Sequence, residues 1–431
     1  MAKYEIKDGV CIIPEGTTEI ESYAFFDKGA LTNIVIPDSV TEIGDFAFCE
    51  CTGLTSVVIP GSVTEIGDHA FFGCTGLTSI EIPTSVTEIG DHAFLGCTGL
   101  TSVVIPDSVT KIGDDAFSDC CALTSVVISN SVTKIGDDAF SDCRALTSIK
   151  VAEDNPKYDS RGGCNAIIET ESNKLLFGCQ STVIPDSVAE IGGAFSNCCA
   201  LTSIEIPTSV TEIGVWAFES CGLTSVVIPD SVTKIGDYAF SDCCALTSVV
   251  IPNSVTKIGH NAFSDCRALT SIKVAEDNPK YDSRGGCNAI IETESNKLLF
   301  GCQSTVIPDS VAEIGRGAFS NCCALTSIEI PTSVTEIGDF AFFGCTGLTS
   351  VVIPSSVTEI GDHAFFGCTG LTNAEIHSPE IEFGIRVLCE CENLKSIKVP
   401  AKKTDYYKKR LPEELHDLIV EMEPKKKTKK K

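Results

Sequence analysis

The chain has 431 residues, of which 43% are hydrophobic, and its formal net charge is −27. Residues 1–400 hold 21 Lys/Arg against 53 Asp/Glu, whereas residues 401–431 hold 11 against 6. So acidic a body repels nucleic acid and anionic membranes, which excludes both as expected partners. No run of about 18 apolar residues occurs, so no membrane insertion is expected.

The start of the chain predicts a cap. Residues 1–30 are expected to form an N-terminal cap and a degenerate first repeat, which shields the first hydrophobic layer from water. Met1–Gly9 lacks the apolar stretch of a secretory signal. Together with 24 cysteines, this favours a reducing cytoplasm as the location of the protein.

A 23-residue repeat dominates residues 31–400. In the template Leu100–Cys120, the β-branched residues before Pro106 predict a short strand with Val103 and Ile105 pointing inward. Pro106 lacks an N–H group and is expected to end the strand. Each repeat alone buries little, so the repeats must stack.

The second half of the template predicts a return wall and a turn. Val109 and Ile112 are expected to form the wall, and Gly113 suits a turn with positive φ. Asp114 is expected to cap the N-terminus of one helical turn. The residues expected inside that turn are Ala116, Phe117 and Cys120.

Stacking these repeats predicts an α/β-type repeat solenoid. It is expected to be a curved leucine-rich-repeat stack with one parallel β-sheet face, short helical turns on the other side, and two hairpin inserts. Its strands would lie about 4.8 Å apart.

The two inserts span residues 152–178 and 275–301. Each contains two apolar segments around a polar turn, in the first case Thr170–Asn173, which predicts a β-hairpin. The hairpin is either a lateral protrusion that contacts a partner or a tolerated variant of the convex side. Residues 146–192 and 269–315 are identical over 47 positions, which indicates recent duplication.

The C-terminus predicts a second cap and a tail. Residues 401–424 form the expected C-terminal cap, with an apolar helical face made of Leu411, Leu415, Leu418 and Ile419. Residues 425–431 form the expected basic disordered tail. The tail either engages an anionic partner, serves as an address, or has no function.

The pattern L-x-x-I/V-x-I-P-x-S-V-T-x-I-G-x-x-A-F-x-x-C, seen in Leu100–Cys120, resembles the BspA-like (Treponema-type) leucine-rich repeat and recurs over almost the whole chain. The resemblance implies a curved solenoid with roles in adhesion, host-protein binding or cell–cell contact. It also implies a cell-surface or secreted location, so that both this and the cytoplasmic location stay open.

The sequence offers no catalytic chemistry. Phosphate-binding, dinucleotide-binding and nucleophile-elbow motifs are absent. His69, His92 and His363 share one repeat position, which predicts surface residues of a turn. The cysteine that ends each repeat is expected to be a buried, reduced, small hydrophobe. We therefore predict no enzyme activity, no cofactor and no metal.

The candidate binding surface is the fifth residue of each repeat, which should face outward from the concave sheet face. We call these residues the valine strip: Val35, Val58, Glu81, Val104, Val127, Lys150, Val183, Glu205, Val227, Val250, Lys273, Val306, Glu329 and Val352. The alternative is that valine here only favours a strand. The strip has no aromatic anchors, so modest affinity is expected.

These observations predict a monomeric, non-catalytic repeat protein that binds a protein ligand, such as a host or cell-surface protein. The alternative function is an intracellular scaffold or structural repeat protein.

Overall fold

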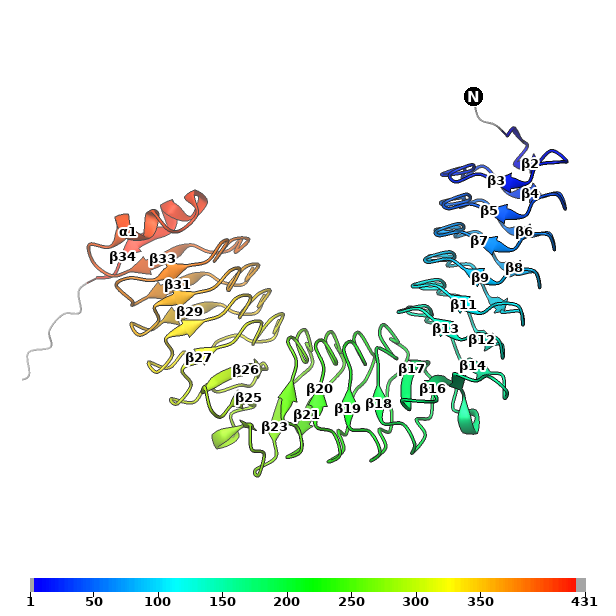
Figure 1. Cartoon of the computed structure of the whole chain (residues 1–431). Coiled ribbons are helices and arrows are strands. Elements are labelled where there is room, and N and C mark those ends of the chain that lie inside the picture. The colour runs from blue at the N-terminus through cyan, green and yellow to red at the C-terminus, as the bar shows by residue number, and fades with distance from the viewer. Residues whose placement is uncertain (1–3, 424–431) are drawn as a thin grey trace, which may run out of the picture. The chain divides into compact units, whose positions relative to one another are not determined.

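The computed structural model describes residues 4–423 and divides into two compact units, with a boundary between Cys221 and Gly222. In each unit the 23-residue repeats stack as successive layers, as the ribbons show (Figure 1). We call one such layer a rung and name it by its first residue. Most rungs contribute one short strand to a main ladder and a shorter one to a second ladder, but within residues 4–423 no main-ladder strand forms at 182–184, 202–206, 224–228, 305–307 or 326–330.

The main ladder carries the predicted strands of the repeat. In a three-residue strand of this ladder, the middle residue points inward and its two neighbours point outward. In Ser102–Val104, for example, only Val103 is buried. The strands pair in parallel and in register, with Val103 opposite Val126. In the first unit they are β2 (Val10–Ile12), β4 (Asn33–Val35), β6 (Ser56–Val58), β8 (Ser79–Glu81), β10 (Ser102–Val104), β12 (Ser125–Ile128) and β14 (Ser148–Val151).

The return wall is itself a parallel ladder, which we did not predict. Its strands are only two residues long in most rungs, and Ile112 pairs with Ile89 and Ile135. In the first unit they are β3 (Glu19–Ile20), β5 (Glu42–Ile43), β7 (Glu65–Ile66), β9 (Glu88–Ile89), β11 (Lys111–Ile112), β13 (Lys134–Ile135), β18 (Glu190–Ile191) and β19 (Glu212–Ile213).

The second unit repeats this arrangement. Its main ladder contains β21 (Ser248–Ile251), β23 (Ser271–Val274), β29 (Ser350–Ile353), β31 (Asn373–Ile376), β33 (Ser396–Val399) and β34 (Ile419–Glu421). Its second ladder contains β20 (Lys234–Ile235), β22 (Lys257–Ile258), β27 (Glu313–Ile314), β28 (Glu336–Ile337), β30 (Glu359–Ile360) and β32 (Glu382–Phe383).

Each insert adds three strands and a short 3₁₀ turn. In the first unit these are β15 (Tyr158–Asp159), η1 (Arg161–Gly163), β16 (Ala166–Glu169) and β17 (Lys174–Gly178). In the second they are β24 (Tyr281–Asp282), η2 (Arg284–Gly286), β25 (Ala289–Glu292) and β26 (Lys297–Gly301). The strands within an insert pair antiparallel, and its last strand joins the second ladder in parallel.

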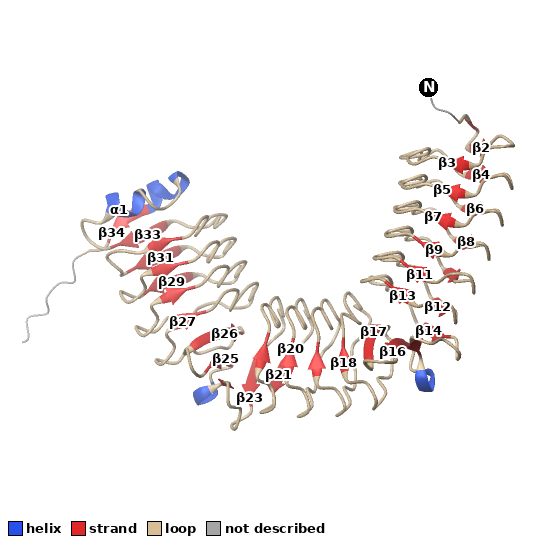
Figure 2. Ribbon diagram, in the orientation of Figure 1, coloured by secondary structure: helices blue, strands red, loops and turns tan. Residues whose placement is uncertain are grey.

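The prediction of helical turns, and with it the α/β-type class, is wrong. Within residues 4–423 the only helices are the two insert turns and, near the C-terminus, α1 (Thr404–Lys408) and η3 (Glu413–Leu418), and the repeat turns are loops (Figure 2). Asp115 and Asp119 have φ of 52° and 57°. Left-handed residues interrupt a right-handed helix. The N–H groups of Asp115 and Phe117 instead donate to carbonyls of the next rung. The molecule is therefore a β-solenoid.

Two residues of the turn have other roles than predicted. Asp114 caps no helix, because its Oδ1 accepts the N–H of Asp137 in the next rung at 3.0 Å. Gly113 is not among the glycines with positive φ. A Cβ there would lie 2.4 Å from Oδ1 of Asp91, so Gly113 permits close approach between rungs.

The interior is built from side-chain ladders, as predicted. Ala116, Phe117 and Cys120 are fully buried. Phe117 stacks between Phe94 and Phe140, at ring-centroid distances of 5.1 and 5.5 Å. The Cys120 thiol donates to the carbonyl of Phe94. A regular rung therefore contributes one ring and one thiol to columns that run along the stack as far as the insert, where Phe177 meets Phe140 edge-on.

The two ends of the described chain close differently. At the start, β1 (Ile6–Lys7) pairs antiparallel with β2, and Tyr4 stacks on Phe25. At the end, Tyr407 of α1 is buried and its hydroxyl donates to the carbonyl of Ser378 at 2.6 Å. The basic tail predicted at 425–431 lies outside the described residues.

Candidate functional site

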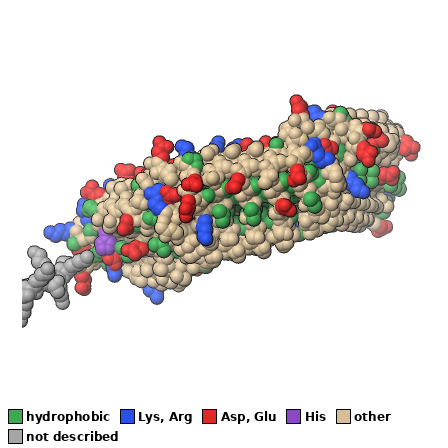
Figure 3. All heavy atoms as spheres, turned by 90° about the horizontal axis from the view of Figure 1, so that it is seen from below, with side chains coloured by type: hydrophobic (Ala, Val, Ile, Leu, Met, Phe, Trp, Pro, Cys, Tyr) green, Lys and Arg blue, Asp and Glu red, His purple; other side chains and the backbone are tan. Residues whose placement is uncertain are grey.

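The valine strip lies on the outward face of the main ladder. All fourteen predicted residues are exposed. Nine of them stand in a main-ladder strand, one position after its buried middle residue. The other five lie in rungs where no main-ladder strand forms: Val183, Glu205, Val227, Val306 and Glu329. The relative exposure of its valines runs from 45% at Val127 to 80% at Val227. One face of the molecule shows hydrophobic side chains set among acidic and basic ones (Figure 3).

Charged residues interrupt the strip singly. In the parallel register, Glu81 lies beside Val58, and Lys150 lies beside Val127. Lys273 lies beside Val250 in the same way. An apolar strip with isolated charges provides hydrophobic contact area and selects a ligand through its charge pattern.

Two open depressions adjoin the strip. The first, of about 680 Å³, lies in the first unit between Val183 and Glu205, over Ile204. The second, of about 590 Å³, lies in the second unit between Glu329 and Val352, over Ile328. Sequence reasoning did not find either one, because the isoleucine in their floor occupies a position that is buried in the regular rungs.

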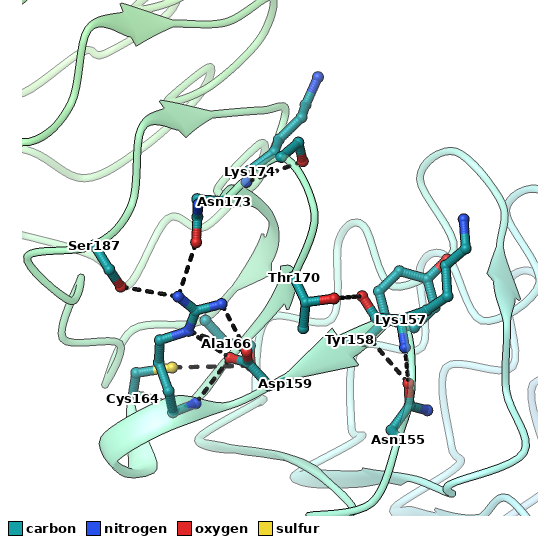
Figure 4. A network of polar contacts seen from close by, with 12 residues as sticks. Asn155, Lys157, Tyr158, Asp159, Cys164, Ala166, Thr170, Asn173, Lys174 and Ser187 are labelled. Carbon is teal, nitrogen blue, oxygen red and sulfur yellow. Dashed lines mark hydrogen bonds and ion pairs between the residues drawn. The ribbon is translucent and has the colours of Figure 1, made fainter.

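The first insert is held by a polar network (Figure 4). Arg161 donates to both carboxylate oxygens of Asp159, to Oδ1 of Asn173 at 2.8 Å, and to the hydroxyl of Ser187 at 3.0 Å. A bidentate guanidinium–carboxylate pair fixes geometry more strongly than a single bond. The insert is therefore fastened to the rung that follows it.

A buried asparagine fastens the same insert to the preceding rung. The side-chain amide of Asn155 donates to the carbonyls of Ser129 and Val132, and its Oδ1 accepts the N–H groups of Lys157 and Tyr158. The second insert has the identical sequence and repeats these contacts through Asn278.

The histidines of the repeat turns are part of an aromatic stack. Phe46 stacks on His69 at 4.3 Å and His69 on His92 at 4.4 Å between ring centroids. Nε2 of His92 lies 3.4 Å from a carboxylate oxygen of Asp115. Burial and the neighbouring His92 lower the pKa of His69 below its usual value. The rings thus pack along the turn edge, half-buried rather than freely exposed.

Two buried cysteines of the ladder, Cys51 and Cys97, are poor nucleophiles. Burial raises the pKa of the Cys51 and Cys97 thiols to about 12. Only a thiolate is reactive or binds metal well. Across residues 4–423, no three His, Cys, Asp or Glu side chains come together as a metal ion would require. In the same stretch, no helix is long and apolar enough to cross a membrane.

Comparison with known proteins identifies the family to which the chain belongs. The model of the BspA type leucine rich repeat region matches residues 13–154, 168–284 and 291–410, in six copies. The chain therefore belongs to the BspA-type leucine-rich repeat proteins, as its sequence predicted. None of the curated proteins matches it.

Solved structures of bacterial leucine-rich repeat proteins resemble the chain. One from Eubacterium ventriosum has 23% identity and a TM-score of 0.55, covering 84% of this chain and 91% of that one. One from Bacteroides ovatus has 24% identity and a TM-score of 0.46, covering 98% of each chain. A leucine rich cell surface protein from Faecalibacterium prausnitzii has 27% identity and a TM-score of 0.42, covering 94% of each.

Proposed function

We propose that this protein is a non-catalytic binding protein that holds a protein ligand on the valine strip. The observation that carries the proposal is the strip itself. All fourteen of its residues are exposed, although nine of them are valines. Solvent-exposed rows of apolar side chains carry a hydrophobic penalty that binding relieves. Repeat proteins commonly bind through such extended surfaces.

The ligand we propose is a host or cell-surface protein, bound in adhesion. Single charges within the strip fit a ligand with complementary charges and apolar side chains. Because the strip contains no aromatic residue, several weak contacts along it must act together.

The test is a double substitution, Val104→Lys with Val127→Lys. These two residues are exposed neighbours in register on β10 and β12. The matched control is Thr64→Lys with Thr87→Lys, which adds the same charge at exposed positions next to the second ladder. Both variants are expected to keep the far-ultraviolet circular dichroism of the wild type.

Immobilised wild-type chain is exposed to mammalian serum and, separately, to a bacterial lysate. Ligands held by the strip are expected to bind the control as well as the wild type, and at least about tenfold more weakly to the Val104/Val127 variant. If every ligand binds all three proteins equally, the strip is not the binding surface. Ligands found only in the lysate would instead favour an intracellular scaffold.

A further inference from the structure

The first turn of the stack exposes two aromatic rings side by side. Tyr23 and Phe26 lie three residues apart, and the N–H of Phe26 donates to the carbonyl of Tyr23. Their ring centroids are 5.8 Å apart and the ring planes are inclined at 54°. Tyr23 is 56% exposed and Phe26 is 42% exposed. We call these two residues the open ring pair.

The N-terminal cap covers the neighbouring ring and leaves the open ring pair uncovered. Tyr4 of the cap stacks on Phe25, which is buried. Tyr23 stacks on Phe46 of the next rung at 4.8 Å between centroids, which occupies one of its two ring faces. In the described part of the chain, no lysine or arginine lies over either ring of the pair. Because Tyr23 is still largely exposed, its second face is open to a ligand.

The second unit contains an equivalent ring pair that carries a cation. Phe340 and Phe343 are also three residues apart, with centroids 5.8 Å apart and ring planes inclined at 57°. The guanidinium carbon of Arg316, in the preceding rung, lies 5.2 Å from the centre of the Phe340 ring. Nη1 of Arg316 also lies 3.4 Å from Oδ2 of Asp339. An arginine of this chain thus covers the surface that corresponds to the open face of Tyr23.

A second arginine covers the other end of the same aromatic block. Phe340 stacks on His363 and Phe343 on Phe366, at 5.0 and 5.5 Å between centroids. The guanidinium carbon of Arg386, in the following rung, lies 4.7 Å from the centre of the Phe366 ring. A planar, weakly hydrated guanidinium group stacks well on an aromatic face. Arginine is therefore the side chain that fits the aromatic surfaces of these turns.

The charges around the open ring pair also favour a cation. Residues 31–100 contain nine Asp/Glu and no Lys/Arg, so the adjoining rungs supply no arginine of their own. Asp27 follows Phe26 directly and is exposed, and Glu50 of the next rung is half-buried. Burial and the charges of Glu50 and Asp27 raise the pKa of the Cys49 thiol to about 11. Since Cys49 takes the place of Phe26 in the next rung, both carboxylates lie near the open ring pair.

We infer that the open ring pair binds an arginine from a segment of a protein partner. The guanidinium group stacks on the open face of Tyr23, as Arg316 does on Phe340, and a second basic residue of the segment pairs with Asp27 or Glu50. This site lies on the turns and not on the valine strip. It gives the protein an aromatic anchor, which the strip lacks, and it stands independently of the proposed function.

The probe is the peptide acetyl-Gly-Ser-Arg-Ser-Arg-Ser-Gly-amide, titrated at low ionic strength onto the full chain labelled with fluorotyrosine. We expect the fluorine resonance of Tyr23 to shift with a dissociation constant below about 5 mM. The resonance of Tyr406 should not move, because Arg410 and Lys403 of the chain already lie over that ring, at 3.8 and 5.3 Å from its centre.

Two matched substitutions test the ring pair while keeping Tyr23 as the reporter. Phe26→Ser removes the second ring, and serine stands at this place in the regular rung of Ser118; binding should weaken about threefold or more. Phe72→Ser is the control, since Phe72 holds the same place two rungs later, where it meets His69 at 5.8 Å. It should leave the dissociation constant at Tyr23 unchanged.

A peptide with citrulline in place of both arginines tests the need for charge. Citrulline keeps the shape of arginine and is neutral, so binding should weaken at least about tenfold.

The second unit gives a converse test. In a chain carrying Phe340→Tyr, the fluorotyrosine introduced there should not respond to the arginine peptide while Arg316 is present. Adding Arg316→Ala should make it respond, because the ring face is then open.

The inference is overturned if the peptide causes no shift at Tyr23 up to about 5 mM, if the citrulline peptide binds equally well, or if Phe72→Ser weakens binding as much as Phe26→Ser. A resonance of Tyr23 that moves with protein concentration alone would assign the pair to a second copy of the chain instead. The Val104/Val127 variant should bind the peptide like the wild type, so a failure here leaves the proposed function standing.

Discussion

The Leu77 and Leu201 rungs begin with the same fourteen residues and adopt different structures. In the first, the strand pairs and Ile80 is buried, whereas in the second no strand forms and Ile204 is partly exposed. The layer before the Leu77 rung supplies the strand β6, whereas the layer before the Leu201 rung follows an insert and has no main-ladder strand. In a solenoid, a neighbouring rung therefore decides whether a strand-forming sequence becomes a strand.

Removing the insert should abolish the structural difference between the Leu77 and Leu201 rungs. We predict that replacing residues 152–178 by a second copy of residues 129–145 gives the Leu201 rung a regular neighbour, so that Ser203–Glu205 forms a strand. Hydrogen exchange at these amides should slow by at least about a hundredfold. Unchanged exchange would show that the insert is not the cause.

Releasing the insert from the preceding rung should be the next largest effect. Asn155→Ala removes four hydrogen bonds in a buried site and leaves main-chain partners unsatisfied. We expect the free energy of unfolding to fall by about 2–4 kcal/mol, measured by urea denaturation. The control Asn130→Ala, at an exposed position in a regular rung, should cost less than about 0.5 kcal/mol. If the two variants lose equal free energies of unfolding, Asn155 does not fasten the insert to the preceding rung.

A smaller effect is expected where the insert meets the next rung. A Cβ at Gly178 would lie 2.3 Å from the ring of Phe195, so Gly178→Ala forces the ring to move. Overpacking of this kind costs about 1–3 kcal/mol. Gly61→Ala is the control, since nothing lies within 4 Å of its added Cβ, and its melting temperature should match the wild type.

The smallest expected effect is the change in stability when His69, in a regular rung, becomes protonated at low pH. The folded pKa of His69 lies below its unfolded value, so the unfolded chain binds the proton more readily. Stability from the neutral ring is therefore present above about pH 6.5 and is lost as the pH falls below it. We expect His69→Phe to reduce this acid-induced loss by less than about 1 kcal/mol, because a half-buried ring is screened.

The control for the pH prediction is His260→Asn, at an exposed turn position. It should keep the dependence of melting temperature on pH that the wild type shows between pH 7.5 and 5. If His69→Phe behaves identically, the aromatic stack does not couple to protonation.

Periodicity predicted the parts of the structure that depend on alternation of side chains. Val103 and Ile105 point inward, and Phe117 and Cys120 form buried ladders, because each recurs at a fixed place in the repeat. The second ladder was missed because strands of two residues, such as Lys111–Ile112, leave no alternation to recognise. The turn was misassigned because local capping preferences were applied to Asp114, whose partner is 23 residues away.

The candidate site also has a part that the sequence predicted and a part that it did not. The outward position of the strip residues follows from strand geometry alone, so Val104 and Val127 could be named from the sequence. The two depressions over Ile204 and Ile328 could not be named in this way, since no pattern within the identical segments distinguishes these residues from Ile80. Their place in the second rung after an insert is the signal that would have indicated them.

In the first unit, the hydrogen bonds to the aspartates of successive turns all run in the same direction along the stack. The N–H of Asp68 donates to the carboxylate of Asp45, that of Asp91 to Asp68, and that of Asp114 to Asp91. Through these contacts, the carboxylates of Asp45, Asp68 and Asp91 each accept an N–H from the rung that follows in the sequence. During synthesis from the N-terminus, each newly emerging repeat meets a template already in place. Such a chain can begin to fold before the ribosome has finished it.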